Sequence, residues 1–129
     1  MKTTANAALA AALLSAALVA SPGGAAAQDA RTYSADQLLG PCRTADSDAR
    51  ELGQAAQVEC EQYLLGFVDA LAATGASGAG KSTCPPSVNT GSEVRWAFVR
   101  WVYGDFSKRR AMPAGDALLA TLKDSFPCN

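Results

Sequence analysis

The sequence contains no histidine among its 129 residues. Histidine is the usual general base of serine and cysteine hydrolases and a common zinc ligand. The four cysteines include no CxxC pair of the kind found in zinc sites, and the acidic residues show no spacing typical of a paired acid and base. We therefore predict that the protein is not an enzyme and that it carries neither a metal nor a cofactor.

Long apolar runs are also scarce. The sequence has one, and it lies close to the N-terminus. Lys2 precedes a stretch of Ala, Leu, Val and one Ser from Ala7 to Ala20, and the Ser-Pro-Gly-Gly segment at 21–24 breaks any helix. Ala25-Ala26-Ala27 then offers small residues for cleavage. This order is typical of a secretory signal peptide. The alternative, a membrane anchor, needs about 20 apolar residues, and this run is shorter.

We therefore predict a signal peptide over residues 1–27 and a periplasmic mature domain over residues 28–129, with no membrane partner after cleavage. Without Lys2, the mature domain carries ten basic and twelve acidic residues, which gives a net charge near −2. Such a balance provides no positive field that would attract nucleic acid. We therefore expect no nucleic-acid partner.

The apolar residues of the mature domain recur with the period of helices. Ser34-Ala-Asp-Gln37 is a capping box that opens a short helix, which Gly40-Pro41 closes or kinks. A continuous apolar stripe from Glu51 to about Ala73 predicts a long helix. Its members are Cys60, Leu64, Phe67, Val68 and Leu71. No stretch alternates polar and apolar residues over the length of a strand. The predicted fold class is therefore all-α, a small bundle of four to five helices.

Two residues of the long helix call for a structural explanation. A glycine in the middle of a helix costs about 1 kcal/mol relative to alanine. We therefore expect a neighbouring helix to approach closely at Gly66 and Ala70. Asp69 shares the same half-buried stretch, so we expect it to hydrogen-bond a backbone group or an arginine.

The C-terminal half predicts two more helices with a basic segment between them. Thr90-Gly-Ser-Glu93 is a second capping box, and Gly104 ends the helix that it opens. The apolar residues of this helix form two faces: Val94, Phe98, Trp101 and Val102 on one, and Trp96, Val99 and Tyr103 on the other. Such a helix is either central in the fold or shared with a partner subunit. A basic loop at 107–110 follows, and the last helix runs from Pro113 to a stop at Pro127.

An even number of cysteines in an exported domain predicts two structural disulfides. Four cysteines allow three connectivities. If neighbouring helices are antiparallel, Cys42 at the end of the first helix lies near Cys60, early in the second. Cys84, before the third helix, lies at the same end of the bundle as Cys128, after the fourth. We therefore predict the pairs Cys42–Cys60 and Cys84–Cys128.

The segment from Gly75 to Ser82 matches the phosphate-binding pattern GxxxxGK[ST] at every required position. That motif follows a buried strand and opens a helix whose N-terminal amides hold the phosphates. Here a long helix precedes the match, and Cys84-Pro85-Pro86 follows it, where a helix cannot run. We therefore reject the match and predict no nucleotide binding.

Four elements of the chain stand in a distinctive order: Leu38 and Leu39 before Cys42, the run CEQYLLGFVDA from Cys60 to Ala70, Cys84-Pro-Pro, and Phe126-Pro-Cys128. In this order and spacing the chain resembles the Rap1a/Tai immunity proteins of type VI secretion. The resemblance covers essentially the whole mature domain. Gln62, where a small residue is common in the family, and the irregular segment 103–113 depart from the pattern.

The resemblance implies a periplasmic, all-helical inhibitor that is often a homodimer and that occludes the active site of a peptidoglycan amidase delivered by neighbouring bacteria. On this interpretation, a basic loop is the first candidate to contact an acidic cleft rim. It consists of Ser107, Lys108, Arg109 and Arg110. The Gly75–Ser82 loop is the second candidate. Trp96, Val99 and Tyr103 are candidate dimer contacts. Their structural alternatives are a solvated turn for the basic loop and ordinary core for the aromatic set.

An alternative function is that of a periplasmic envelope-stress protein or a small acid-stress-type chaperone. That class also uses short, disulfide-linked helical chains. Such chaperones usually expose apolar surface at low pH. Two disulfides and the lack of histidine make that switch less natural here, although carboxylates can also respond to acid. We therefore favour the inhibitor.

Overall fold

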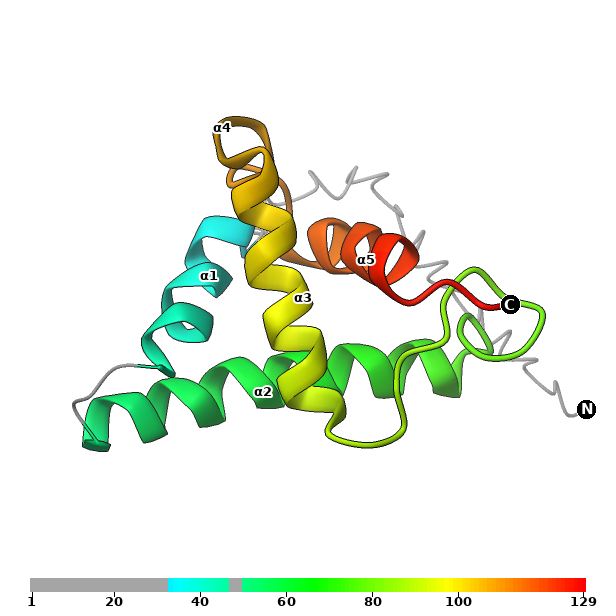
Figure 1. The fold of residues 1–129 in the computed structure, drawn as a ribbon, viewed down its shortest axis with the longest axis horizontal. Coiled ribbons are helices and arrows are strands. Elements are labelled where there is room, and N and C mark those ends of the chain that lie inside the picture. Colours follow the sequence, from blue (N-terminus) through cyan, green and yellow to red (C-terminus); the bar gives the residue numbers. More distant parts are fainter. Residues whose placement is uncertain (1–32, 47–49) are drawn as a thin grey trace, which may run out of the picture.

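The structure, a computed structural model, describes residues 33–46 and 50–129, which form five helices (Figure 1). They are α1 (Ala35–Thr44), α2 (Arg50–Ala73), α3 (Thr90–Gly104), α4 (Phe106–Arg109) and α5 (Ala114–Ser125). Within these residues the only strand-like pairing is an isolated bridge between Ser34 and Pro113. The prediction of an all-α fold with four to five helices is therefore confirmed. The predicted signal peptide lies outside the described residues.

Helix α1 begins at the predicted capping box. The Ser34 hydroxyl accepts a hydrogen bond from the Gln37 backbone at 3.2 Å, and the Gln37 side chain accepts one from the Ser34 backbone at 2.9 Å. The helix does not close at Pro41 but continues to Thr44. Pro41 has no N–H for the Gln37 carbonyl, and the Tyr33 hydroxyl donates to that carbonyl instead, at 3.2 Å. This substitute donor helps α1 to continue past its proline.

Helix α2 supports the other helices from one side. In Figure 1 it runs along the bottom of the molecule, and α1, α3 and α5 lie above it. The largest fully buried apolar side chains come from α1, α2, α3 and α5: Leu38, Leu64, Val94, Phe98, Val102, Leu118 and Leu122. Burial of each contributes about 1.5–3 kcal/mol. The predicted stripe of α2 faces this core, since Cys60 and Leu64 are buried and Phe67, Val68 and Leu71 pack against it.

The expectations for Gly66, Asp69 and Ala70 were wrong. All three residues are exposed, and a Cβ added at Gly66 would meet no heavy atom within 4 Å. The reason is the helical period, because at about 100° per residue these positions point away from the stripe that α2 turns to the core. Close packing therefore does not offset the helix-weakening effect of Gly66.

The second capping box was also wrong. The N-cap of α3 is Asn89, which has a positive φ of 53° and makes no side-chain cap hydrogen bond. Thr90 lies inside the first turn, where its hydroxyl donates to the Pro86 carbonyl at 2.6 Å. The turn at 86–89 therefore satisfies Thr90 locally, so Thr90 does not cap the helix.

Both predicted disulfides are present. Cys42 pairs with Cys60 and joins α1 to α2, and Cys84 pairs with Cys128 and joins the α2–α3 loop to the segment after α5. The predicted connectivity is therefore confirmed, although α1 and α3 cross α2 steeply and do not run antiparallel to it (Figure 1).

Candidate partner-binding surfaces

The predicted basic loop is a single helical turn, α4, followed by Arg110. Asp105 holds its start, since one carboxylate oxygen accepts from the Ser107 hydroxyl at 3.3 Å and the other lies 3.5 Å from the Lys108 ammonium. Basic side chains suit the last turn of a helix, whose carbonyl end carries partial negative charge. Lys108 remains largely exposed, and so does Ser107. The helical turn therefore exposes the side chains of Ser107 and Lys108 to solvent while its backbone is held in a defined conformation.

Arg109 differs from its neighbours because it is bound to the end of α3. Its guanidinium donates to the Trp101 carbonyl and lies over the Trp101 ring, with Cζ 4.0 Å from the ring centroid. Gly104 makes room for this arrangement, because a Cβ there would lie 3.0 Å from Arg109 Nη1. Arg109 therefore caps α3 and is the least exposed of the four predicted contact residues, whereas the more exposed Arg110 pairs with Asp36 of α1 at 3.4 Å.

The predicted dimer contacts lie along the outer side of α3. Trp96 and Tyr103 are 47% and 46% exposed, and Val99 between them is partly buried against the core. Tyr103 is oriented by Arg43, whose guanidinium donates to the Tyr103 hydroxyl at 3.1 Å. Two large aromatic side chains two helical turns apart thus face the same way, in contact with solvent.

This aromatic face continues into the basic turn. The rings of Tyr103 and Phe106 stack with centroids 5.6 Å apart, and the Arg110 guanidinium lies over Phe106 at 5.1 Å. We call the combined set the α3–α4 surface: Trp96, Val99, Tyr103, Phe106, Ser107, Lys108 and Arg110. The structure therefore joins two groups of residues that the sequence suggested separately.

The Gly75–Ser82 loop lies elsewhere, at the C-terminal end of α2, whereas α4 lies beyond the far end of α3 (Figure 1). Its glycines at 75, 78 and 80 have positive φ values of 67°, 109° and 76°. The loop follows a helix, and α3 begins only at Thr90, so Lys81 and Ser82 do not open a helix as a phosphate-binding loop requires. Beside the loop runs an open groove of about 400 Å³, between α2 and Pro85-Pro86.

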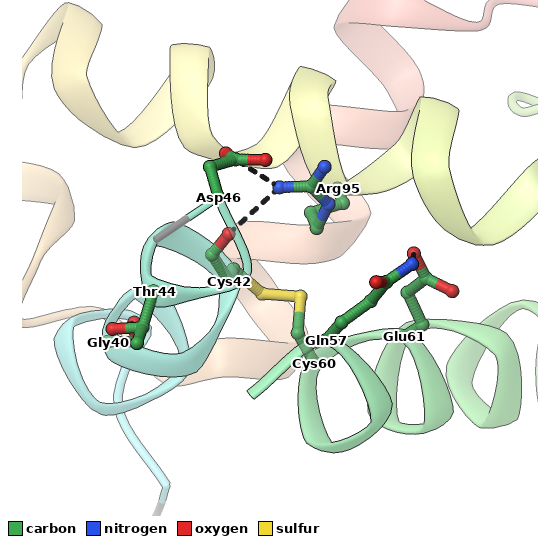
Figure 2. Close-up of polar contacts among 8 residues, drawn as sticks. All are labelled: Gly40, Cys42, Thr44, Asp46, Gln57, Cys60, Glu61 and Arg95. Carbon is green, nitrogen blue, oxygen red and sulfur yellow. Dashed lines mark hydrogen bonds and ion pairs between the residues drawn. A yellow bond between two sulfur atoms is a disulfide. The ribbon is translucent and has the colours of Figure 1, made fainter. Parts of the chain in front are cut away.

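Sequence reasoning missed a buried arginine. Arg95 is only 6% exposed, and its Nη1 donates to the Asp46 carboxylate at 2.9 Å and to the Cys42 carbonyl at 3.2 Å (Figure 2). Its guanidinium also lies 4.6 Å from the Trp96 ring centroid. The contact links the end of α1 to α3 above the Cys42–Cys60 disulfide. The apolar pattern of α3 gave no signal of it, because Arg95 falls between the two apolar faces.

Charges of opposite sign are separated along the chain. The middle of α2 carries Glu59, Glu61 and Asp69, whereas the stretch 95–110 has one acidic residue, Asp105. The basic residues of that stretch are Arg95, Arg100, Lys108, Arg109 and Arg110. In Figure 1, α2 and α4 lie on opposite sides of the molecule. The segment 95–110 is thus rich in basic residues along the chain, but Arg95 pairs with Asp46, Lys108 with Asp105 and Arg110 with Asp36, so acidic partners lie beside most of them.

A disulfide-linked helical bundle with an exposed aromatic and basic surface has the features of a small binding protein. No group of three or more potential metal ligands occurs in the part of the chain that the structure describes. The chain belongs to the family of Rap1a immunity proteins, whose family model matches residues 34–128. No curated protein and no solved structure matches it.

Family membership gives the general function. The chain is an immunity protein, an inhibitor that binds a secreted effector protein, and it is not an enzyme. This result favours the inhibitor over the stress-chaperone alternative. Among residues 33–46 and 50–129, no helix is both long enough and apolar enough to cross a membrane.

Proposed function

We propose that this immunity protein acts in the periplasm and occludes the active-site cleft of a peptidoglycan amidase delivered by type VI secretion. The layout of residues 1–27 as a signal peptide supports export, and residues 28–129 form the mature domain. Two disulfides suit an oxidising compartment. The amidase target rests on the resemblance to the Rap1a/Tai proteins, and family membership supports an effector partner.

The observation that carries the proposal is the basic end of the α3–α4 surface, from Phe106 to Arg110, whereas the aromatic part on α3 is assigned to a dimer contact below. The Arg110 guanidinium lies over the Phe106 ring, which stacks on Tyr103, and Lys108 is exposed on the same turn. Aromatic and arginine side chains provide much of the binding energy in protein interfaces. Arg109 holds the turn in place, so less conformational freedom is lost on binding. The 84% exposed Lys108 side chain also suits contact with an acidic cleft rim.

The experiment measures inhibition of peptidoglycan hydrolysis by purified NlpC/P60-like amidases. The double variant Lys108→Glu/Arg110→Glu should weaken inhibition by about ten- to hundredfold, because it reverses two charges at the proposed contact. The matched control compares two single charge reversals at exposed lysines: Lys108→Glu in the basic turn and Lys123→Glu on α5, outside both candidate contact regions. Equal inhibition by both variants would rule out the basic turn as the contact, and failure of the unmodified protein to inhibit any such amidase would rule out the target class.

We also propose that the protein forms a homodimer through Trp96, Val99 and Tyr103. Exposed aromatic residues beside a partly buried valine support this choice, since such residues are enriched in interfaces. Trp96→Glu should convert the dimer to a monomer in size-exclusion chromatography with light scattering. Val88→Glu, at an apolar residue that is 71% exposed in the α2–α3 loop, should leave it dimeric. A monomeric unmodified protein would contradict the proposal.

A further inference from the structure

The two disulfides lie in different surroundings. Cys42 and Cys60 are both 0% exposed and belong to the buried core cluster. Their bridge joins two helices and lies beneath the Arg95–Asp46 pair (Figure 2). A reagent therefore reaches these sulfurs only if the bundle itself opens.

The Cys84–Cys128 bridge lies outside the core cluster, and both of its cysteines are partly exposed. Cys128 follows the end of α5 and stands between exposed Pro127 and Asn129. Cys84 lies in non-helical chain, where its N–H donates to the Phe126 carbonyl at 2.8 Å. The sulfur of Cys128 is 3.0 Å from the Gly78 carbonyl oxygen. The bridge therefore fastens the 74–89 loop to the end of the bundle, at the surface.

We propose that the Cys84–Cys128 bridge is a site of thiol–disulfide exchange with dithiol reductants, and that the Cys42–Cys60 bridge does not react in the folded protein. One thiolate of the reductant bonds to a bridge sulfur, the Cys84–Cys128 S–S bond breaks, and the released cysteine thiolate takes a proton from water. The second thiol of the reductant then displaces the other cysteine. The reductant is oxidised to its disulfide, and two protein thiols form.

Reduction at this site changes the loop and not the bundle. The α1, α2, α3 and α5 side chains that form the core remain packed around Cys42–Cys60. The 74–89 loop loses its covalent link to the segment after α5 and keeps only non-covalent ties such as the Cys84–Phe126 hydrogen bond. One wall of the groove beside α2, which includes Cys84, Pro85 and Pro86, is thereby released. Opening of a surface segment without global unfolding is the expected behaviour of a region with few core contacts.

The first test is timed alkylation of the unmodified protein in dithiothreitol under native conditions, followed by peptide mapping. Cys84 and Cys128 should be labelled at least about tenfold faster than Cys42 and Cys60, while the far-ultraviolet circular dichroism stays unchanged. Labelling of all four cysteines at one rate, or labelling only together with loss of helical signal, would overturn the proposal.

The second test reads the loop directly. Lys81 is an exposed trypsin site within it, and Lys123 on α5 is an internal reference. Selective reduction should speed cleavage after Lys81 and leave cleavage after Lys123 unchanged. Cys84→Ser/Cys128→Ser should reproduce the fast cleavage without reductant, whereas Cys42→Ser/Cys60→Ser should not raise the ratio of the Lys81 to the Lys123 cleavage rate above that of the unmodified protein. An unchanged rate at Lys81 after verified reduction would contradict the release of the loop.

Discussion

At the scale of single residues, the environment of an ion pair decides its contribution to stability. The Arg95–Asp46 and Arg110–Asp36 pairs have the same chemistry, but the Arg95 side chain is 7% exposed and the Arg110 side chain 51%. A buried guanidinium has lost its hydration, so its partner must supply the missing interaction. An exposed guanidinium is still solvated, and its pair contributes little.

Asp46→Asn should therefore lower the free energy of unfolding by about 1–2 kcal/mol, because Arg95 then keeps a buried charge without its carboxylate. Asp36→Asn, the matched change at the exposed pair, should alter it by less than about 0.5 kcal/mol. Urea denaturation of both variants measures the difference. Equal effects would show that burial of the arginine does not determine how much an ion pair contributes to the free energy of unfolding.

Arg109 and Lys108 make a second contrast, within one turn of helix. Arg109→Ala removes both the donor to the Trp101 carbonyl and the cation–π contact, and should destabilise the protein by about 1–2 kcal/mol. Lys108→Ala, whose side chain is 84% exposed, should change stability by less than about 0.5 kcal/mol. Thermal denaturation of the two variants provides the comparison, and a neutral Arg109→Ala would contradict the capping role.

At the scale of elements, α1 depends on the protonated form of one tyrosine. Burial raises the pKa of Tyr33, and nearby Glu59 and Tyr63 raise it further. The folded state thus favours the neutral phenol, which is also the form that donates to the Gln37 carbonyl. The stability that the neutral Tyr33 phenol contributes is complete below the ordinary tyrosine pKa of about 10. It is lost as the pH rises through the higher pKa that Tyr33 has in the folded state.

Tyr33→Phe should accordingly lower stability by about 1 kcal/mol at neutral pH and should reduce the further loss of stability above pH about 10. Tyr103→Phe, at a tyrosine of the outer α3 face, should leave the alkaline loss in place. Urea denaturation across this pH range gives the measurement. An unchanged alkaline profile in Tyr33→Phe would contradict the assignment.

The elements themselves could largely be predicted from the sequence, because apolar periodicity and cysteine order depend on local spacing. The stripe of α2, the cap at Ser34 and both disulfides follow from it. Some errors arose because apolar periodicity carries no information on individual side-chain hydrogen bonds. Tyr33 donates to the Gln37 carbonyl where Pro41 has no N–H, and Thr90 donates to the Pro86 carbonyl, in both cases across four residues. Periodicity of α3 likewise did not reveal Arg95, since its partners come from the end of α1.

The candidate surfaces were predicted only as separate groups. Exposed aromatic positions and a basic run can be read from the chain, but their meeting through Tyr103 and Phe106 depends on how α4 folds back after Gly104. The contact between Arg109 and the end of α3 also depends on how α4 folds back. Neither this contact nor the Tyr103–Phe106 stacking can be predicted from the sequence without the tertiary fold.

At the scale of the whole molecule, the proposed contact between the basic turn and an acidic cleft rim predicts a salt-dependent encounter with the effector. If the exposed Lys108 side chain helps to guide that encounter, raising the salt concentration from about 0.05 to 0.5 M should lower the association rate constant by about tenfold. The dissociation rate constant should change much less. Stopped-flow measurement of both constants tests this, and a salt-independent association rate would show that long-range attraction does not guide binding.

The 74–89 loop lies where proteins with this fold can differ in length without changing the helical bundle. The exposed Ala79 stands between Gly78 and Gly80, away from the core, so extra residues there need only be enclosed in a longer loop. Doubling a flexible loop lowers stability by only about 0.6 kcal/mol. A short Gly-Ser insertion at Ala79 should therefore leave thermal stability nearly unchanged, whereas the same insertion at Ala97, inside α3, should abolish folding. Insertions in the glycine-rich part of this loop, before the buried Thr83 and the Cys84 anchor, can thus accumulate while the bundle stays the same.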